Sequence, residues 1–358
     1  MIVAHEVKQL GLGGTEKTMV VLLRHLKALG VTVHAFVPMG ADMTRAEEVA
    51  SICDLHVYGS AEDLERRLGE LRPHVLHRHR NGLPDTVDKI RLDERTRVVE
   101  TNVYGDHGSR ADLRLFVSQD IASEQKWPEP FQVLYNPVEP PVKEVQVQRH
   151  ERRFEGVSER DTARVVVFGR VGRPDPHIYD PIALEAYSRV ESPLTRYVAL
   201  APPPNMVDHA RWLGLKTFVA LPPTIDEREL SCLYSVFDVL AHARRDGETC
   251  GMNIQEAMYH GLPVISHVSD THNAHVEILG EGYPWIAPRG DVVAYTRFMR
   301  AAVEDAQLRR ELGERNRQRA EREFDARRIA ERLLQHYVQL ADGPAPSSSR
   351  ALVATTTT

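Results

Sequence analysis

Cysteine is scarce in this sequence: Cys53, Cys232 and Cys250 are the only three among 358 residues, and no two form a C-x-x-C pair. This scarcity excludes a zinc ribbon and disfavours a disulfide framework, so a reducing compartment fits best. No apolar run approaches the roughly 20 residues that span a bilayer, and the first residues lack the basic start and apolar core of a signal peptide. We therefore expect a cytoplasmic protein, whose contact with the inner face of the membrane, if any, is peripheral.

An excess of charge of one sign is also lacking. The formal net charge is −6, which provides no global field that would attract nucleic acid. Hydrophobic residues make up 42% and charged residues 27% of the chain, a balance that can bury a sizeable core without disulfides or metals. At a typical domain length of roughly 150 residues, the length predicts two domains with a cleft between them, and we expect no nucleic-acid partner.

The first part of the chain alternates short β-rich runs with longer amphipathic stretches, which predicts a parallel sheet covered by helices. One helix is expected to follow the Gly-rich segment at residues 11–14, with Thr15 as its N-cap and Gly30 just past its end. Strands are expected at 3–7, 31–37, 54–58, 73–77, 97–101 and 113–118, and further helices at 41–52 and 61–72.

The second part repeats this architecture after a stretch rich in proline and charge, residues 140–162, which we interpret as an interdomain linker. Strands are expected at 164–170, 196–202, 216–222, 237–243 and 262–268, and helices at 231–237, 252–260, 311–323 and 327–340. The segment 343–358 is of low complexity and is expected to be disordered. The pattern therefore predicts an α/β protein with two doubly wound halves.

The first candidate site is the loop that holds Gly11, Gly13 and Gly14 between a strand and a helix start. Without side chains, such a loop lets backbone N–H groups approach a phosphate near the helix dipole. It is not a dinucleotide fingerprint, because Glu16 stands at the last glycine position of G-x-G-x-x-G, and it is not a P-loop. A tight turn with no ligand is an equally good interpretation of the loop alone.

The second candidate site is the segment GETCGMNIQEAMYHGLPVI, in which Glu248 and Glu256 stand eight residues apart. Glu248 precedes a loop and Glu256 lies one to two turns inside the next helix, so both carboxylates can face one ligand across the helix N-terminus. The backbone amides of residues 251 to 253 can meet a phosphate or a hydroxyl there. The alternative is that Glu248 caps the helix and Glu256 is solvated, as the equally spaced Glu62 and Glu70 are expected to be.

This segment resembles the E-x7-E motif of retaining GT-B glycosyltransferases of family 4 (glycosyl transferases group 1). LGLGGTEK resembles their glycine-rich donor loop, and VVVFGR resembles the strand and Gly-Arg that open their second domain. The resemblance implies two Rossmann-like domains facing across a cleft, with Glu256 on the donor ribose, Glu248 on the donor sugar and Arg170 on the diphosphate. The donor-binding residues that it implies are Gly13, Gly14, Arg173, Cys250, Gly251, Met252, Asn253 and Glu256.

Two positions depart from the family's pattern. Ile178 stands where relatives often carry a lysine on the diphosphate, so Arg173 or His177 is expected to replace it. Cys250 stands in place of the usual phenylalanine. In the first half, His79 best matches a family histidine that faces donor sugar or acceptor, and we place it with Glu248 and Arg170 as catalytic. The alternative is a packed strand-end histidine or an exposed H-R-H-R run.

Further polar residues stand at another predicted strand end: Glu100, Thr101, Asn102 and His107. The resemblance also implies that the final helix returns to the first domain. The expected domains are therefore 1–139 plus 325–342 on the acceptor side, the linker 140–162, a donor domain at 163–324, and the tail 343–358.

No metal site is expected, because the sequence contains no H-E-x-x-H and no D-x-D, and no G-x-S-x-G nucleophile elbow is present. The expected function is metal-independent glycosyl transfer with retention, from a nucleotide-diphosphate sugar as co-substrate and without a cofactor. The acceptor is a glycan, a lipid-linked molecule or a small molecule. A GT-B epimerase or phosphorylase, or an inactive sugar-nucleotide-binding protein, remains as an alternative.

Overall fold

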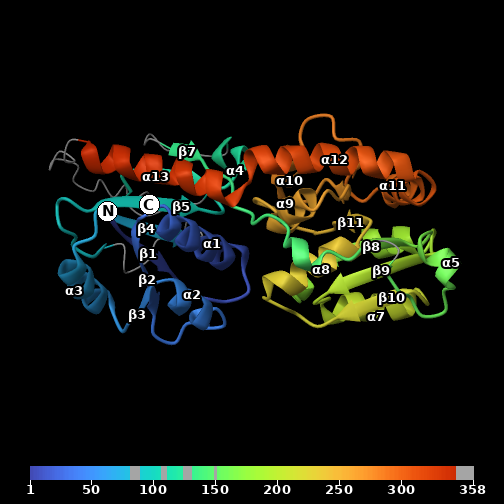
Figure 1. Ribbon diagram of the computed structural model, residues 1–358, viewed down its shortest axis with the longest axis horizontal. Helices are drawn as coiled ribbons and strands as arrows, with labels where there is room; N and C mark the ends of the chain where they lie inside the picture. The colour runs from blue at the N-terminus through green and yellow to red at the C-terminus, as the bar shows by residue number, and fades with distance from the viewer. Residues whose placement is uncertain (81–88, 106–110, 124–130, 149–150, 344–358) are drawn as a thin grey trace, which may run out of the picture.

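A computed structural model of the chain describes residues 1–343 except 81–88, 106–110, 124–130 and 149–150. His107 and residues 344–358 of the predicted tail lie outside the described residues. The chain forms two α/β halves placed side by side, the first blue to cyan and the second green to orange in Figure 1. Each half contains a parallel sheet between helices, which confirms the predicted fold class.

Among the described residues of the first half, seven parallel strands follow the order β3-β2-β1-β4-β5-β6-β7. This order reverses direction at β1 and β4, so the carboxyl ends of these two strands border a crevice. The strands are β1 (Ile2–Val7), β2 (Thr32–Pro38), β3 (Asp54–Tyr58), β4 (Val75–Arg80), β5 (Arg97–Asn102), β6 (Leu113–Phe116) and β7 (Phe131–Val133). The accompanying helices are α1 (Gly14–Ala28), α2 (Ala46–Ile52), α3 (Ala61–Leu71) and α4 (Gln119–Ser123).

In the described part of the second half, six parallel strands follow the order β10-β9-β8-β11-β13-β15, and a separate pair is formed by β12 and β14. The strands are β8 (Val166–Val171), β9 (Thr195–Leu200), β10 (Phe218–Leu221), β11 (Val239–Ala241), β12 (Gly247–Glu248), β13 (Val264–His267), β14 (His272–Asn273) and β15 (Ile286–Ala287). The helices of this half are α5 (Glu159–Thr162), α6 (Ile182–Tyr187), α7 (Pro204–Trp212), α8 (Glu227–Val236), α9 (Met252–Tyr259), α10 (Ala274–Leu279), α11 (Val292–Glu304) and α12 (Ala306–Glu323).

The last helix, α13 (Ala326–Asp342), packs on α1 of the first half, although α12 before it packs on α9 of the second half. Its residues Ile329, Leu333 and Tyr337 are fully buried in the apolar core of the first half. Figure 1 shows α12 and α13 in red, running along one side of the molecule from one half to the other. The chain therefore crosses between the halves a second time, at Phe324 and Asp325.

The predicted N-cap Thr15 is wrong, because α1 begins at Gly14 with Gly13 as its N-cap. A Cβ atom at Gly13 would have to displace the carboxylate of Glu16 in the first turn. The helix expected at 41–52 begins only at Ala46.

The predicted linker 140–162 is anchored on α8 over part of its length. The backbone N–H groups of Val142 and Val147 donate to the hydroxyls of Ser231 and Ser235, at 2.9 Å each. The guanidinium of Arg152 pairs with Asp238 at 3.0 Å. The segment therefore packs as part of the second half. Within the described part of the chain, no helix is both long and apolar enough to cross a membrane.

Candidate functional site

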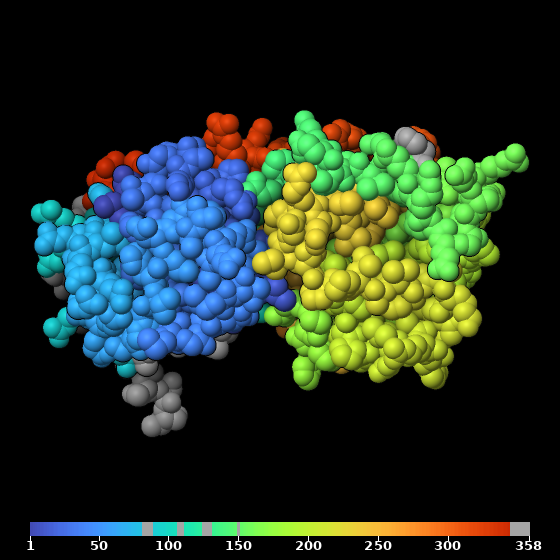
Figure 2. Space-filling model, turned by 60° about the horizontal axis from the view of Figure 1, so that its bottom comes forward, coloured from blue at the N-terminus to red at the C-terminus, as the bar shows by residue number. Residues whose placement is uncertain are grey.

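A pocket of about 210 Å³ lies where the two halves meet, along the seam between the blue and the yellow atoms in Figure 2. The first half contributes the start of α1 and Arg45, and the second half contributes the ends of β8, β9 and β11 and the start of α9. Of the predicted site residues, those that line it are Gly13, Gly14, Arg170, Arg173, Glu248, Met252, Asn253 and Glu256. The fold therefore brings two distant predicted motifs to one place.

Two glycines give the loop before α9 its shape. Gly247 and Gly251 have φ angles of 72° and 79°, a region that residues with side chains rarely adopt. A Cβ atom at Gly247 would also collide with the carbonyl oxygen of His272. Gly251 is the N-cap of α9, and the first bond back to its carbonyl comes from the N–H of Ile254 at 3.0 Å. The amides of residues 251 to 253 therefore precede the hydrogen-bonded turns of the helix, where anions bind well.

Glu248 is held between two side chains at the mouth of this loop. Its Oε1 lies 3.1 Å from His242 Nε2 and its Oε2 lies 3.2 Å from Arg244 Nη1. Burial alone would raise the pKa of Glu248, but the Arg244 charge and the His242 hydrogen bond outweigh it and lower this pKa to about 2. His242 Nδ1 lies 2.9 Å from the Ser266 hydroxyl. The carboxylate is therefore ionised and fixed in orientation at neutral pH.

Glu256 receives partners from both halves of the molecule. Its Oε2 accepts a hydrogen bond from the Tyr234 hydroxyl at 2.7 Å, and its Oε1 lies 2.7 Å from Lys17 Nζ. Lys17 also pairs with Glu227, at 2.9 Å and 3.1 Å to its two oxygens. Burial favours a lower pKa for Lys17, but Glu256 and Glu227 raise it above its ordinary value.

The alternative of a capping Glu248 and a solvated Glu256 therefore disagrees with the geometry, because both carboxylates are paired and largely buried. Sequence reasoning missed Lys17, Glu227 and Tyr234. Lys17 lies one turn into the helix that follows the predicted glycine loop. This position next to a candidate site is the sequence signal that could have identified it. The two acceptors of its charge lie on α8 and α9, far along the chain.

Arg170 is buried at the end of β8 and lines the first pocket. Its guanidinium donates to the backbone carbonyls of Leu200, Ala201 and Arg173, at 3.3 Å each. Burial lowers the pKa of Arg170 from its ordinary value. These bonds tie the loop after β8 to the end of β9.

The two predicted replacements for the missing lysine have different positions. Arg173 lines the pocket, is 47% exposed, and lies 3.8 Å from Asp175. His177 is exposed and is not among the lining residues, whereas Ile178 is buried and lines the pocket. Arg45, which was not predicted, also lines it. Arg173 is therefore the better placed of the two for a diphosphate.

A second pocket of about 400 Å³ adjoins the first and shares Gly13, Gly14, Arg173, Arg244, Glu248 and Met252 with it. Its other walls include His79, Arg80, Tyr104, Cys250, Gly251 and His272. Burial raises the pKa of the Cys250 thiol to about 12, so this group is neutral. A molecule in the second pocket can therefore reach one in the first at the shared residues around Glu248.

His79 lies inside β4, because this strand continues to Arg80 and all six of its residues are buried. The prediction of a strand end at residue 77 is wrong, and so is the exposed H-R-H-R alternative. Arg80 remains inside because it pairs with the buried Glu6 at 2.6 Å. Burial, with a smaller effect of Arg80, lowers the pKa of His79 to about 3. His79 is therefore a neutral imidazole at the second pocket.

Three histidines of adjacent strands cluster beside this pocket, with the ring of His79 stacked on those of His5 and His77. His5 Nδ1 lies 3.0 Å from His79 Nε2. The two nitrogens of His77 meet the hydroxyls of Tyr337 at 2.5 Å and of Thr101 at 2.7 Å. These three rings could bring ligand atoms within 4.8 Å of one another, but hydroxyl groups already occupy both nitrogens of His77.

The predicted strand-end group at Glu100, Thr101 and Asn102 turns inward. Asn102 donates to Glu100 at 3.1 Å, and Thr101 pairs with His77. None of these three residues is among those that line the two cleft pockets. They therefore belong to the polar interior of the first half.

The family described as "Glycosyl transferases group 1" matches residues 204–319, a stretch that includes Glu248 and Glu256. Among curated proteins, none matches this chain. The chain is similar in structure to Anabaena HepE in complex with UDP-glucose, at 14% identity and a TM-score of 0.75, over 95% of this chain and 100% of that one.

Two further solved structures are similar over almost their full length. A glycosyltransferase from Rickettsia africae has 13% identity and a TM-score of 0.73, over 96% of this chain and 99% of that one. Sucrose-phosphate synthase from Thermosynechococcus elongatus has 14% identity and a TM-score of 0.70, over 95% and 99%. The chain therefore has the GT-B fold, as the sequence predicted.

Proposed function

We propose that this protein is a retaining glycosyltransferase of family 4, which moves a sugar from a nucleotide-diphosphate sugar to an acceptor hydroxyl without a metal ion. The observation that carries this proposal is that Glu248 and Glu256 both line one pocket, at the N-terminus of α9 and beside Arg170 and Arg173. This pocket adjoins the second one at Glu248, the residue that would face the donor sugar. A UDP-sugar is the first donor to test, because HepE was solved with UDP-glucose.

Each half of the donor has a chemical partner in this arrangement. The carboxylate of Glu256 would accept hydrogen bonds from ribose hydroxyls, and that of Glu248 from sugar hydroxyls. Arg173, the amides that precede α9 and the glycine loop at Gly13 and Gly14 would surround the diphosphate. Arg170 would support this group, because it holds the carbonyl of Arg173.

Transfer then depends on stabilising the departing nucleoside diphosphate. Its negative charge grows as the glycosidic bond breaks, and fixed positive groups stabilise that charge most in the transition state. The acceptor hydroxyl would attack from the same face of the sugar, since the second pocket meets the first beside Glu248. Neutral His79 could accept a hydrogen bond from the acceptor hydroxyl.

The domain assignment follows from the same proposal. Residues 1–139 with 325–342 would form the acceptor domain and residues 163–324 the donor domain, joined by 140–162. Glycans, lipid-linked molecules and small molecules all remain acceptor classes. A cytoplasmic location, with peripheral contact at the inner face of the membrane, agrees with the low cysteine content.

The test is turnover of a panel of UDP-, GDP- and ADP-sugars with candidate acceptors, in buffer with EDTA. We expect the product to keep the anomeric configuration of the donor, as read by proton NMR. Turnover without an acceptor would indicate an epimerase, and turnover that requires inorganic phosphate would indicate a phosphorylase. Donor binding without turnover, and equal behaviour of the Glu248→Gln variant, would indicate a binding protein.

A further inference from the structure

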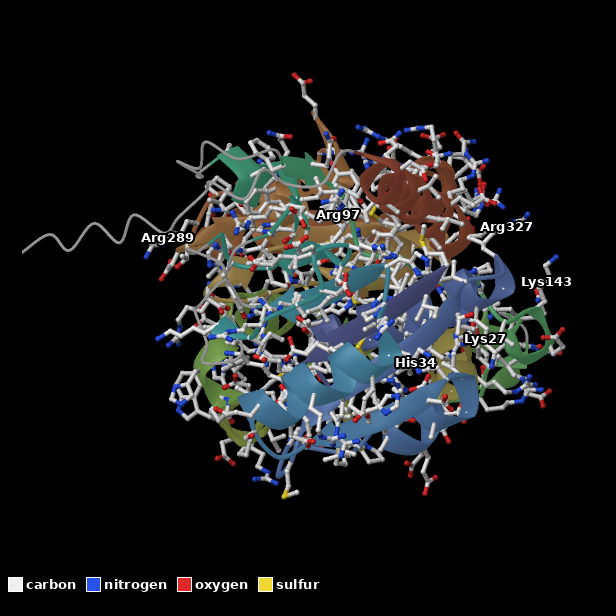
Figure 3. The ribbon with its side chains drawn as sticks, turned by 90° about the vertical axis from the view of Figure 1, so that its left-hand side faces the viewer. Lys27, His34, Arg97, Lys143, Arg289 and Arg327 are labelled. Atoms are coloured by element: carbon white, nitrogen blue, oxygen red, sulfur yellow. The ribbon has the colours of Figure 1, made fainter. Side chains whose placement is uncertain are left out.

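A second group of histidines lies on the outer strands of the first sheet, away from the cleft. His34 on β2 is paired in register with Asp54 on β3, the edge strand, and His56 follows two residues after Asp54. Residues two apart on a strand point to the same face, so all three side chains lie on one face of the sheet. Figure 3 views the first half from the side opposite the second half and labels His34. None of the three lines either cleft pocket.

The atoms of this group are spaced like the ligands of one metal ion. His34 Nδ1 lies 3.2 Å from His56 Nε2 and 3.7 Å from Asp54 Oδ2. Two ligands on a tetrahedral zinc ion, each about 2.0–2.1 Å from the metal, stand about 3.3 Å apart. All three ligand atoms lie within 4.8 Å of one another.

The surroundings of these side chains suit a bound cation with an open position. The Asp54 side chain is 78% exposed and the His34 side chain only 12% exposed, so the group is open on one side and fixed on the other. His56 stacks on Phe36, with ring centroids 4.5 Å apart.

One positive charge faces the group from the helix packed on this side. Arg67 of α3 acts on His56, but it is held by Asp63 at 3.0 Å and 3.1 Å. Asp63 therefore offsets part of this repulsion. The stack of His5, His77 and His79 differs, because hydroxyls occupy His77 and no carboxylate completes that set.

We propose that His34, Asp54 and His56 bind one Zn²⁺ ion, with water at the remaining position. Two imidazoles and one carboxylate are a donor set that zinc prefers. The ion would join edge strand β3 to β2 and so stabilise the exposed edge of the sheet. The site lies on the outer strands and shares no residue with the cleft pockets, so we expect the ion to act on the stability of the sheet and not on sugar transfer.

The experiment titrates the full chain, first stripped with EDTA, with ZnCl₂ by calorimetry at pH 7.5. We expect one zinc ion per chain in the wild type, and at least tenfold weaker binding in Asp54→Asn and in His56→Gln. Asp54→Asn is the primary variant, because an exposed side chain can be changed without disturbing the core. The matched controls, His177→Gln at an exposed position and His79→Gln at the cleft, should bind zinc like the wild type.

A second readout is thermal unfolding. Zinc should raise the melting temperature of the wild type and of both controls, but not of Asp54→Asn or His56→Gln. Equal zinc isotherms for the wild type and Asp54→Asn would overturn the proposal. So would loss of the zinc ion in His79→Gln alone, because this outcome would place the site at the cleft.

Discussion

The two halves of the molecule meet the cleft with the same structural edge, the carboxyl ends of parallel strands, but they present different chemistry there. In the second half, Arg244 and Glu248 are ionised side chains that line the pockets directly. In the first half, His5 and His79 bond to each other, and Arg80 turns to Glu6 inside the sheet. The edge of the second half therefore brings an ionised pair to the pockets, whereas the edge of the first half brings a neutral imidazole and an arginine that is paired within the sheet.

Under the proposed function, this difference corresponds to separate roles of the two halves, one for the donor and one for the acceptor. Fixed charges suit a donor whose diphosphate is invariant, because a preorganised site needs no rearrangement when charge develops. Neutral imidazoles such as His79 suit an acceptor hydroxyl, which is itself neutral. The second half is therefore the part whose variants should change donor chemistry, and the first half is the part whose variants should change folding and acceptor use.

The largest effect is expected from removing α13, the helix that follows the second crossing between the halves and packs on the first half. Deletion from Arg327 onward would expose the apolar surface that Ile329, Leu333 and Tyr337 cover in the first half. We expect the first half to lose its cooperative melting transition and turnover to be abolished. The control ends at Gly343, and it should melt and turn over like the full chain. Equal melting of both truncations would show that α13 is dispensable to the first half.

The next effect concerns the charges of the second half. Arg170→Ala should lower kcat by about 10²–10³-fold, because it removes one positive charge near the departing diphosphate and the hydrogen bond that holds the carbonyl of Arg173. The measurement is steady-state turnover with a donor that the wild type accepts, and the control is Arg164→Ala on the surface, whose side chain is 68% exposed. A change in KM alone would assign Arg170 to ground-state binding instead.

A smaller effect is expected for nucleotide binding. Glu256→Ala should weaken nucleoside diphosphate binding by about 1.5–3 kcal/mol, the value of hydrogen bonds to a charged group. Glu70→Ala is the matched control, because Glu62 and Glu70 have the same spacing on α3 and the Glu70 side chain is 66% exposed. Calorimetry should show a loss for the first variant only. Unchanged affinity in Glu256→Ala would remove this residue from the donor site.

The smallest effect tests the neutral histidines of the first half. The pKa of His79 is lowered to about 3 in the folded chain and is about 6.5 in an unfolded one. The unfolded state therefore binds the extra proton, so this contribution to stability is complete above pH 6.5 and is lost as the pH falls toward 3.

Between pH 6.5 and pH 5, the free energy of unfolding should fall by about 2 kcal/mol less in His79→Gln than in the wild type. Urea denaturation at the two pH values measures this difference. The quantity compared between the variants is the change in the free energy of unfolding with pH, not the free energy at one pH. The control is His177→Gln, which should keep the slope of the wild type. An equal slope in His79→Gln would mean that His79 is protonated inside the fold.

The fold could be predicted from the sequence to a large extent, because alternation of strands and helices is a local signal. The strand 54–58 was placed without error, whereas strand β4 was ended three residues too early. The reason is that His79 and Arg80 have the pattern of polar surface residues, and they are buried beside partners on another strand, His5 and Glu6. Helix α11 was not predicted, although it contributes Met299 and Tyr295 to the core.

The candidate site divides in the same way. Glu248, Gly251 and Glu256 could be found because they lie within one loop and one helix turn of each other. Lys17 could not be assigned a partner, because its ion pair with Glu256 exists only after α1 and α9 are packed across the cleft. Arg173 and His177 are the two predicted replacements for the missing lysine, and of these two only Arg173 lines the pockets.

By itself, the sequence determined the two α/β halves, the glycine loop at Gly13 and Gly14 and the two carboxylates around α9, since backbone conformation and helical spacing act over a few residues. The tertiary structure alone decided which charges face a ligand and which face one another. Lys17 of the first half pairs with Glu256 of the second half, and Tyr337 of the last helix contacts His77 in the first half. Such contacts join residues far apart in the chain, so they depend on how whole sheets and helices pack, which no local pattern encodes.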